Sequence, residues 1–237
     1  MQPTYLPWVG YFDLIDQVDV FVFLDDVQFE KQSWQQRNRI RSSTGLEWIT
    51  VPVLIKGRFG QVIRDVETNG QDYVSKHVRK LAFAYGKAAF FDEYGERLSG
   101  VLAQSSESQK LCDVCLEMIQ WLCSQFGIQK RFVCSSDLAV PGKRSERLVN
   151  LLREVGAKRY LSPLGSKDYL WDDRDIFANA GIDIEFQAYD HPTYRQVYQP
   201  FEAHASAVDL LYNEGPQSLE IIRSGRRPSL AFEEVMA

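Results

Sequence analysis

Short apolar runs alternate along this chain with longer segments of helical spacing. Val20–Leu24 is a continuous apolar run, typical of a strand covered on both faces, and Tyr11–Val18 ahead of it is expected to form a short helix. In the second half, strands are predicted at Arg131–Cys134, Arg159–Ser162 and Ile182–Phe186. This alternation favours an α/β fold with a Rossmann-like, mixed or mostly parallel sheet flanked by helices.

The longest segments with helical spacing lie in the middle of the chain. Asp72–Tyr85 and Glu107–Phe126 predict two helices, which we expect to form a small helical lobe over about residues 70–128. Three further helices are predicted at Ser145–Val155, Trp171–Ala180 and Ala205–Tyr212, the last of which is expected to close the chain. No internal repeat and no Pro-, Gly- or Ser-rich linker divides the sequence, which indicates one domain over residues 1–237.

Between the first strand and the lobe, the sequence favours an antiparallel hairpin. Glu47–Val53 and Gln61–Val66 have apolar residues suited to strands, and their turn is expected at Gly57–Gly60. The preceding polar stretch, Asp25–Arg41, shows no clear amphipathic period, so we expect it to form a loop.

The net charge of −5 at pH 7 gives the chain no overall positive field. We therefore expect no nucleic-acid partner, although a local patch of arginines could hold an anionic small molecule. No apolar run reaches the roughly 18 to 20 residues of a membrane-spanning helix, and the N-terminus lacks the features of a signal peptide. These observations predict a cytoplasmic protein without a membrane span.

Four cysteines raise the question of a metal or redox site. Cys112 and Cys115 form a Cys-x-x-Cys pair, and Cys123 and Cys134 follow. Cys115 and Cys123 fall on a broad apolar helical stripe, where a reduced cysteine acts as a small apolar residue. We therefore predict packing roles and no metal site.

Three stretches near the N-terminus resemble the WbqC-like protein family. They are Met1–Phe12 (MQPTYLPWVGYF), Phe21–Phe29 (FVFLDDVQF) and Trp34–Ile40 (WQQRNRI). The resemblance continues through Leu161–Pro163, Gly165–Tyr169, Tyr189–Gln196 and Ser206–Gly215, and so covers nearly the whole chain. Members of this family usually have a short apolar strand just ahead of the Gln-Pro motif. Because this sequence begins at Met1, either the start lies upstream or the sheet lacks a central element.

The resemblance implies a role in bacterial surface polysaccharide, such as O-antigen or capsule. It implies transfer of an aminoacyl (glycyl-like) or acyl group to a nucleotide-linked amino sugar, with ATP and Mg²⁺ or acyl-CoA as possible sources of the donor. A weaker similarity links the Pro-containing turn to adenylate-forming enzymes, although Gln2, Thr4 and Tyr5 stand where their ATP-binding histidines would be. The alternative is a non-catalytic protein that binds a nucleotide sugar or scaffolds other enzymes of the pathway. A metal-dependent glycosyltransferase is disfavoured, because Asp25-Asp26 lacks the Asp-x-Asp spacing.

Two acidic residues and one histidine are candidates for acid–base chemistry. Asp25 and Asp26 directly follow an apolar strand, where open α/β sheets collect their ligands, and could act as a base or hold Mg²⁺. The alternative is that they cap a helix or begin a loop. His191 has Asp190 and Tyr194 nearby and suits a general base, or else it fixes its own loop.

Polar and aromatic residues in the first forty positions form the predicted binding set. Their mixture of cationic, amide and ring groups suits a sugar or a nucleotide phosphate, whereas a solvated loop is the alternative. Lys167 follows Gly165 and Ser166 in a small-residue turn, which suggests a phosphate contact without the full P-loop spacing. The substrate-binding candidates are Gln2, Tyr5, Trp8, Gln28, Trp34, Arg37, Asn38, Arg39, Lys167 and Tyr194.

Overall fold

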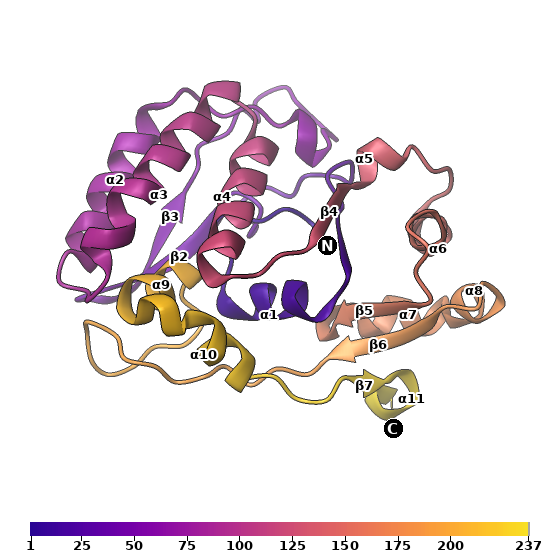
Figure 1. Ribbon diagram of the computed structural model, residues 1–237. Coiled ribbons are helices and arrows are strands. Elements are labelled where there is room, and N and C mark those ends of the chain that lie inside the picture. Colours follow the sequence, from indigo (N-terminus) through magenta and orange to yellow (C-terminus); the bar gives the residue numbers. More distant parts are fainter. Residues whose placement is uncertain (237) are drawn as a thin grey trace.

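A computed structural model describes residues 1–236 and has an α/β arrangement of helices and small parallel and antiparallel sheets (Figure 1). Helix α1 (Val9–Gln17) leads directly into β1 (Val20–Phe23), as the apolar run predicted. β1 pairs in parallel with β4 (Arg131–Cys134), which returns from the far side of the helical layer. Parallel neighbours require such a crossover, so this part of the α/β prediction is confirmed.

The antiparallel hairpin lies one segment earlier than the sequence suggested. It is formed by β2 (Arg37–Ser42) and β3 (Gly45–Thr50), in the register that places Arg39 opposite Trp48. The expected loop 25–41 is therefore wrong over its last residues. The strand predicted at 61–66 is also wrong, because that segment holds the 3₁₀ turn η1 (Ile63–Asp65) and joins its neighbours only by isolated bridges.

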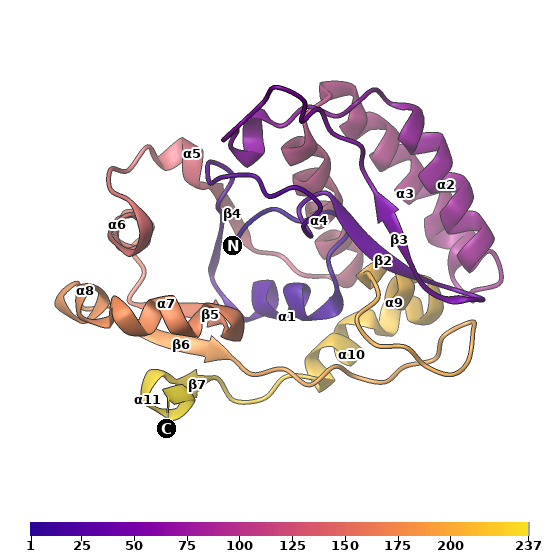
Figure 2. The ribbon, with the colours of Figure 1, turned by 180° about the vertical axis from the view of Figure 1, so that it is seen from behind.

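Three helices cover the hairpin and the first parallel pair (Figures 1 and 2). α2 (Asp72–Tyr85) has the predicted bounds, α4 (Leu111–Phe126) lies within its predicted segment, and α3 (Phe91–Ser105) fills the stretch between them, for which no helix was predicted. The short 3₁₀ turn η2 (Ser106–Ser108) connects α3 to α4.

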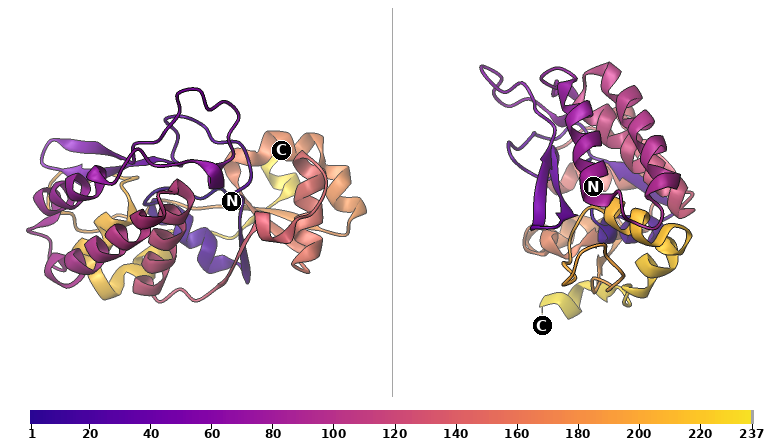
Figure 3. Two further views of the ribbon diagram at one scale, coloured as in Figure 1. Left: turned by 90° about the horizontal axis from the view of Figure 1, so that it is seen from above. Right: turned by 90° about the vertical axis from the view of Figure 1, so that its left-hand side faces the viewer.

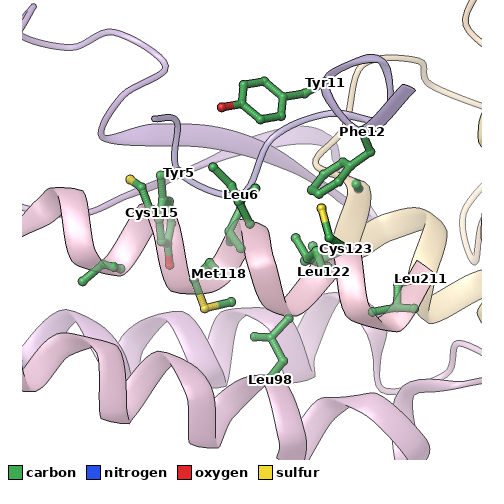
Figure 4. Packing of buried hydrophobic residues seen from close by; sticks show 14 of the residues in the cluster. Tyr5, Leu6, Tyr11, Phe12, Leu98, Cys115, Met118, Leu122, Cys123 and Leu211 are labelled. Atoms are coloured by element: carbon green, nitrogen blue, oxygen red, sulfur yellow. The ribbon is translucent and has the colours of Figure 1, made fainter. Parts of the chain in front are cut away.

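The core between these helices and the N-terminal turn is dominated by the buried face of α4 (Figure 4). Cys115 and Cys123 lie on this face as free thiols, in the packing positions that the helical stripe predicted, and Cys112 is also a buried free thiol. Burial raises the pKa of Cys123 to about 12, so this thiol stays protonated and apolar in character at neutral pH.

The second half builds a smaller unit with its own apolar cluster. β5 (Arg159–Pro163) pairs in parallel with β6 (Asp183–Gln187), and β7 (Leu230–Ala231) adds to β6 in the antiparallel sense. α5 (Ser135–Leu138) directly follows β4, and the helices around the second sheet are α6 (Arg144–Glu154), α7 (Lys167–Asp172), α8 (Arg174–Asn179) and α11 (Phe232–Met236). The 3₁₀ turn η3 (Leu164–Ser166) leads into α7, and the helix predicted at 171–180 is thus two short helices interrupted at Asp173.

The chain does not close with the helix predicted at 205–212. α9 (Ala207–Glu214) occupies that region, and the 3₁₀ turn η4 (Gly215–Gln217), α10 (Ser218–Ser224), β7 and α11 follow it. α9 packs beside α3 and α10 beside α1, so the C-terminal segment runs along the underside of both halves (Figure 3). Within residues 1–236, no helix has the length and apolar character needed to cross a bilayer.

Candidate functional site

The turn between Met1 and α1 is fixed to its surroundings by buried hydrogen bonds. The Tyr5 hydroxyl lies 2.8 Å from Nδ1 of His77, and the Tyr5 backbone N–H donates to the carbonyl of Trp34 at 3.1 Å. Tyr5 is fully buried, so its side chain anchors the turn from within the core. Gln2 accepts a hydrogen bond from Gln35 at 3.0 Å, and this ties the start of the turn to the segment that precedes β2.

Two arginines of β2 lie against exposed tryptophans. The guanidinium carbon of Arg37 is 4.1 Å from the centre of the Trp48 ring, and that of Arg39 lies 5.7 Å from Trp34 and 5.8 Å from Trp48. Trp34 and Trp48 are 49% and 43% exposed, so their rings remain open to a ligand. Alternation along the strand turns Asn38 inward, where its amide donates to the carbonyl of Tyr5 at 3.3 Å.

Trp8 packs against two histidines of the second half, His191 and His204. Its ring stacks on His191 with centres 5.9 Å apart and lies 5.2 Å from the ring of His204. The two histidine rings are themselves 5.0 Å apart. The backbone N–H of Ser206 donates to the carbonyl of Arg39 at 2.7 Å, which holds the His204 segment against β2.

His191 has the hydrogen bonding of a neutral base. Its Nδ1 lies 2.8 Å from the carbonyl oxygen of Pro192, and because a carbonyl can only accept, Nδ1 carries the proton. Nε2 is then the unprotonated nitrogen, and it is buried without a hydrogen-bond partner among residues 1–236. Burial lowers the pKa of His191, and the neighbouring His204 adds to this effect, so the ring is neutral at pH 7.

These residues form one continuous feature, which we call the cation–aromatic surface. Arg37 and Arg39 form no salt bridge within residues 1–236, and the Nε atom of each has no hydrogen-bond partner there. Guanidinium groups bind phosphate, and tryptophan faces stack on sugar or base rings. The members of the surface are Trp8, Trp34, Arg37, Arg39, Trp48, His191 and His204.

A groove of about 900 Å³ begins beside this surface and runs between the two halves of the molecule. Trp34 belongs to both features. The groove is lined by Gln2 and Thr4 of the first half and by Ser166 and Tyr169 of the second. The groove therefore gathers polar groups from both halves, an arrangement typical of ligand sites.

Asp25 and Asp26 form a polar network at the end of β1. The Ser136 hydroxyl donates to Asp25 at 2.5 Å and its backbone N–H donates to the same carboxylate at 3.0 Å. The hydroxyl of Ser135 lies 3.1 Å from Asp25 and 2.6 Å from Asp26. These contacts fasten β1 to the start of α5, which is the capping role that the sequence left open beside the catalytic one.

Asp26 also forms a two-pronged ion pair with Arg147 of α6. Burial opposes ionisation of Asp26, but the hydrogen bonds from Arg147 and Ser135 outweigh it and lower the pKa of the carboxyl. Arg147 and Arg144 line a second cavity of about 450 Å³ between the end of β1 and α7.

Gln28 and Lys167 lie apart from the cation–aromatic surface, whereas the ring of Tyr194 packs against that of His191 with centres 6.2 Å apart. Gln28 and Lys167 are exposed, the first beside the 3₁₀ turn η1 and the second at the start of α7. Tyr194 is buried and donates from its hydroxyl to Asp209 at 2.7 Å. Burial raises the pKa of Asp209 to about 6, and this buried pair holds the loop that carries His191 against α9.

Sequence reasoning missed two members of the surface. Trp48 was included only as part of the strand expected at 47–53, and no site role was predicted for His204. The alternation of Arg37, Arg39 and Arg41 with inward residues was the available signal for a strand whose polar face opposes Trp48. Nothing in the sequence pairs His204 with Trp8, because only the fold brings these segments together. Within residues 1–236, no group of three or more His, Cys, Asp or Glu side chains is placed to hold a metal ion.

Comparison with known proteins gives two matches. A family model described as the WbqC-like protein family matches residues 2–221, which include every member of the cation–aromatic surface. An uncharacterized protein of Mycobacterium tuberculosis is 37% identical over 228 residues, covering 96% of this chain and 97% of that protein. No solved structure matches the chain.

Proposed function

Since this chain belongs to the WbqC-like protein family, which is associated with polysaccharide biosynthesis, we propose that it binds a nucleotide-linked amino sugar and transfers an aminoacyl or acyl group to it. The observation that carries the proposal is the pair Arg37 and Arg39, stacked on exposed tryptophans and free of ion pairs within residues 1–236. A nucleotide sugar offers both a diphosphate for the arginines and rings for the tryptophans.

The diphosphate would lie along β2. Arg37 and Arg39 are two residues apart on one strand face, so their side chains project in the same direction. Trp34 and Trp48 flank them and exclude water on one side, which strengthens the contact between guanidinium and phosphate. The sugar would then extend along the same surface toward Trp8, beside which His191 lies.

His191 is the proposed general base. An amino group attacks an acyl carbon only as the neutral amine, so the nitrogen must lose a proton as its bond to that carbon forms and the bond to the donor's leaving group breaks. Nε2 of His191 has a free lone pair but is buried, so the exposed His204 beside it would relay the proton from the amine to Nε2. The donor would be an acyl-CoA, or an amino acid activated by ATP with Mg²⁺.

A non-catalytic binding protein of the same pathway is the second candidate. The hydrogen bonds of Asp25 and Asp26 favour it, because Ser135, Ser136 and Arg147 already occupy the carboxylates that might otherwise act as a base. Binding would then use the same cation–aromatic surface without turnover, and the protein would deliver the sugar to another enzyme of the pathway.

Calorimetric titration with a panel of nucleotide-linked amino sugars tests the binding step. Arg39→Ala and Trp34→Ala should each weaken the affinity by tenfold or more. The matched controls are Arg174→Ala and Trp171→Ala, because Arg174 stacks on Trp171 at 4.8 Å on another part of the surface. Equal affinity for all four variants, or no binding of any panel member to the native protein, would overturn the proposal.

Turnover separates the two candidates. Native protein is incubated with the nucleotide sugar that it binds and with one of two donors, either acyl-CoA or a mixture of ATP, Mg²⁺ and an amino acid. The mass of the sugar is then measured by mass spectrometry. An acylated product that disappears in His191→Gln, with sugar affinity retained, supports the transferase. Sugar binding without product from either donor supports the binding protein.

A further inference from the structure

A phenylalanine stands almost fully in water on a loop of the first half. Between β3 and the 3₁₀ turn η1 the chain forms a loop at Ile55–Gln61, which we call the Phe59 loop. Phe59 is 95% exposed. Burial of a phenylalanine ring is favourable, so a position that holds the ring outside the protein leaves that free energy available to a partner.

The tip of the Phe59 loop is a fixed turn. Gly57 and Gly60, on either side of Arg58 and Phe59, have φ angles of +74° and +66°, which other residues rarely adopt. The backbone N–H of Arg58 donates to the carbonyl of Ile55 at 3.2 Å and closes the turn. This backbone conformation directs Phe59 away from the body of the protein.

The base of the loop is joined to the core. The side-chain amide of Gln61 donates to the carbonyl of Leu54 at 3.2 Å, which links the two ends of the loop. The backbone N–H of the buried Phe29 donates to the carbonyl of Gln61 at 3.0 Å. The loop is therefore braced at its base and presents Phe59 at a constant distance from the core.

The surroundings of Phe59 are cationic although the protein is acidic overall. No acidic residue occurs from Val51 to Arg64. Lys56 is exposed and forms no ion pair within residues 1–236. Arg58 and Lys110 both contact Glu67, at 2.7 and 3.3 Å, so one carboxylate faces two cations. The loop therefore carries net positive charge around its exposed ring.

This combination fits a lipid surface better than a protein surface. The centre of a protein–protein interface needs a contiguous apolar area and is poor in lysine, but the neighbours of Phe59 are Arg58 and Gly60. An anionic bilayer needs no such area, because its surface attracts each lysine or arginine near it. Single apolar rings enter the boundary between headgroups and acyl chains.

We propose that the Phe59 loop binds the surface of an anionic lipid bilayer. Phe59 enters between the headgroups, and Lys56 and Arg58 lie against their phosphates. One ring and a few cations give weak, reversible attachment. The inference does not rest on the proposed function, because it uses no member of the cation–aromatic surface.

Co-sedimentation of the full chain with lipid vesicles tests the proposal. The protein should bind vesicles of mixed phosphatidylglycerol and phosphatidylcholine, should not bind phosphatidylcholine alone, and should be released as the salt concentration rises. Phe59→Ser should weaken the binding about tenfold. The matched control is Phe83→Ser, because Phe83 is 79% exposed on α2 and should have no effect.

A charge reversal tests the cationic part separately. Lys56→Glu should weaken vesicle binding at least about fivefold, whereas Lys76→Glu, at an exposed position of α2, should leave it unchanged. Absence of binding to anionic vesicles, or an equal loss in the variants of Phe59 and Phe83, would overturn the proposal. Sedimentation velocity without lipid covers the other occupant: a dimer that Phe59→Ser dissociates would assign the loop to a second copy of the chain instead.

Discussion

Lowering the pH should weaken the attachment of the N-terminal turn to the β2–β3 hairpin, because His77 joins the two. Its Nε2 lies 3.1 Å from the carbonyl of Thr50, and its Nδ1 lies 2.8 Å from the hydroxyl of Tyr5. A carbonyl only accepts, so Nε2 carries the proton and Nδ1 accepts from Tyr5. Burial lowers the pKa of His77 from 6.5 to about 4, so the folded protein keeps this arrangement at neutral pH.

The size of the effect follows from the two pKa values. In the unfolded chain His77 takes up its proton near pH 6.5, whereas in the folded protein it does so near pH 4. Between these values the unfolded state binds more protons, so the free energy of unfolding falls as the pH falls. At about 1.36 kcal/mol per pH unit, the total loss is about 3.4 kcal/mol, of which about 2 kcal/mol is lost between pH 7 and pH 5.

Urea denaturation at pH 7 and pH 5 measures this loss in the native protein and in His77→Phe. The variant should be less stable at both pH values, because Tyr5 loses its acceptor, but its change between them should differ from that of the native protein by about 2 kcal/mol. Asp209 titrates in the same range with the opposite sign, and because it is present in both proteins its contribution cancels. An equal change in both proteins would refute the reasoning.

Three further predictions concern other contacts. Asp209→Asn should remove a pH dependence of stability whose sign is opposite to that of His77. Burial raises the pKa of Asp209 to about 6, so the free energy of unfolding of the native protein falls by about 3 kcal/mol as the pH rises from 3.8 to 6. Urea denaturation of both proteins at pH 4 and pH 7 measures the difference. Gly10→Ala should displace Trp8, because a Cβ at Gly10 would overlap its ring, so nucleotide-sugar affinity should fall although alanine favours the helix; unchanged tryptophan fluorescence and affinity would contradict this. Arg226→Ala should lower the free energy of unfolding by about 3 kcal/mol, because it leaves the fully buried Asp13 without its ion-pair partner. The control is Arg227→Ala, which should change the free energy of unfolding by less than about 1 kcal/mol because its partner Asp190 is exposed.

Periodicity predicted the elements whose pattern is set by one buried face. α2 has the predicted bounds, and β4 is placed as predicted, because their apolar residues face a single core. The start of β2 was missed for the opposite reason. Arg37, Arg39 and Arg41 share one face of the strand, although Arg41 is buried there, and a strand with arginine at every second position resembles a polar loop when no partner is known.

The candidate site was predictable only where it depends on residue type. Arg37, Arg39, Trp34 and Trp8 were identified by their chemistry, and the fold brings them to one surface. Tyr5 and Asn38 were identified by the same chemistry but are buried, since the alternation that turns Arg39 outward turns Asn38 inward. Whether such a residue is buried or exposed depends on how the strands of the hairpin pair and how distant loops pack, and a single sequence shows neither.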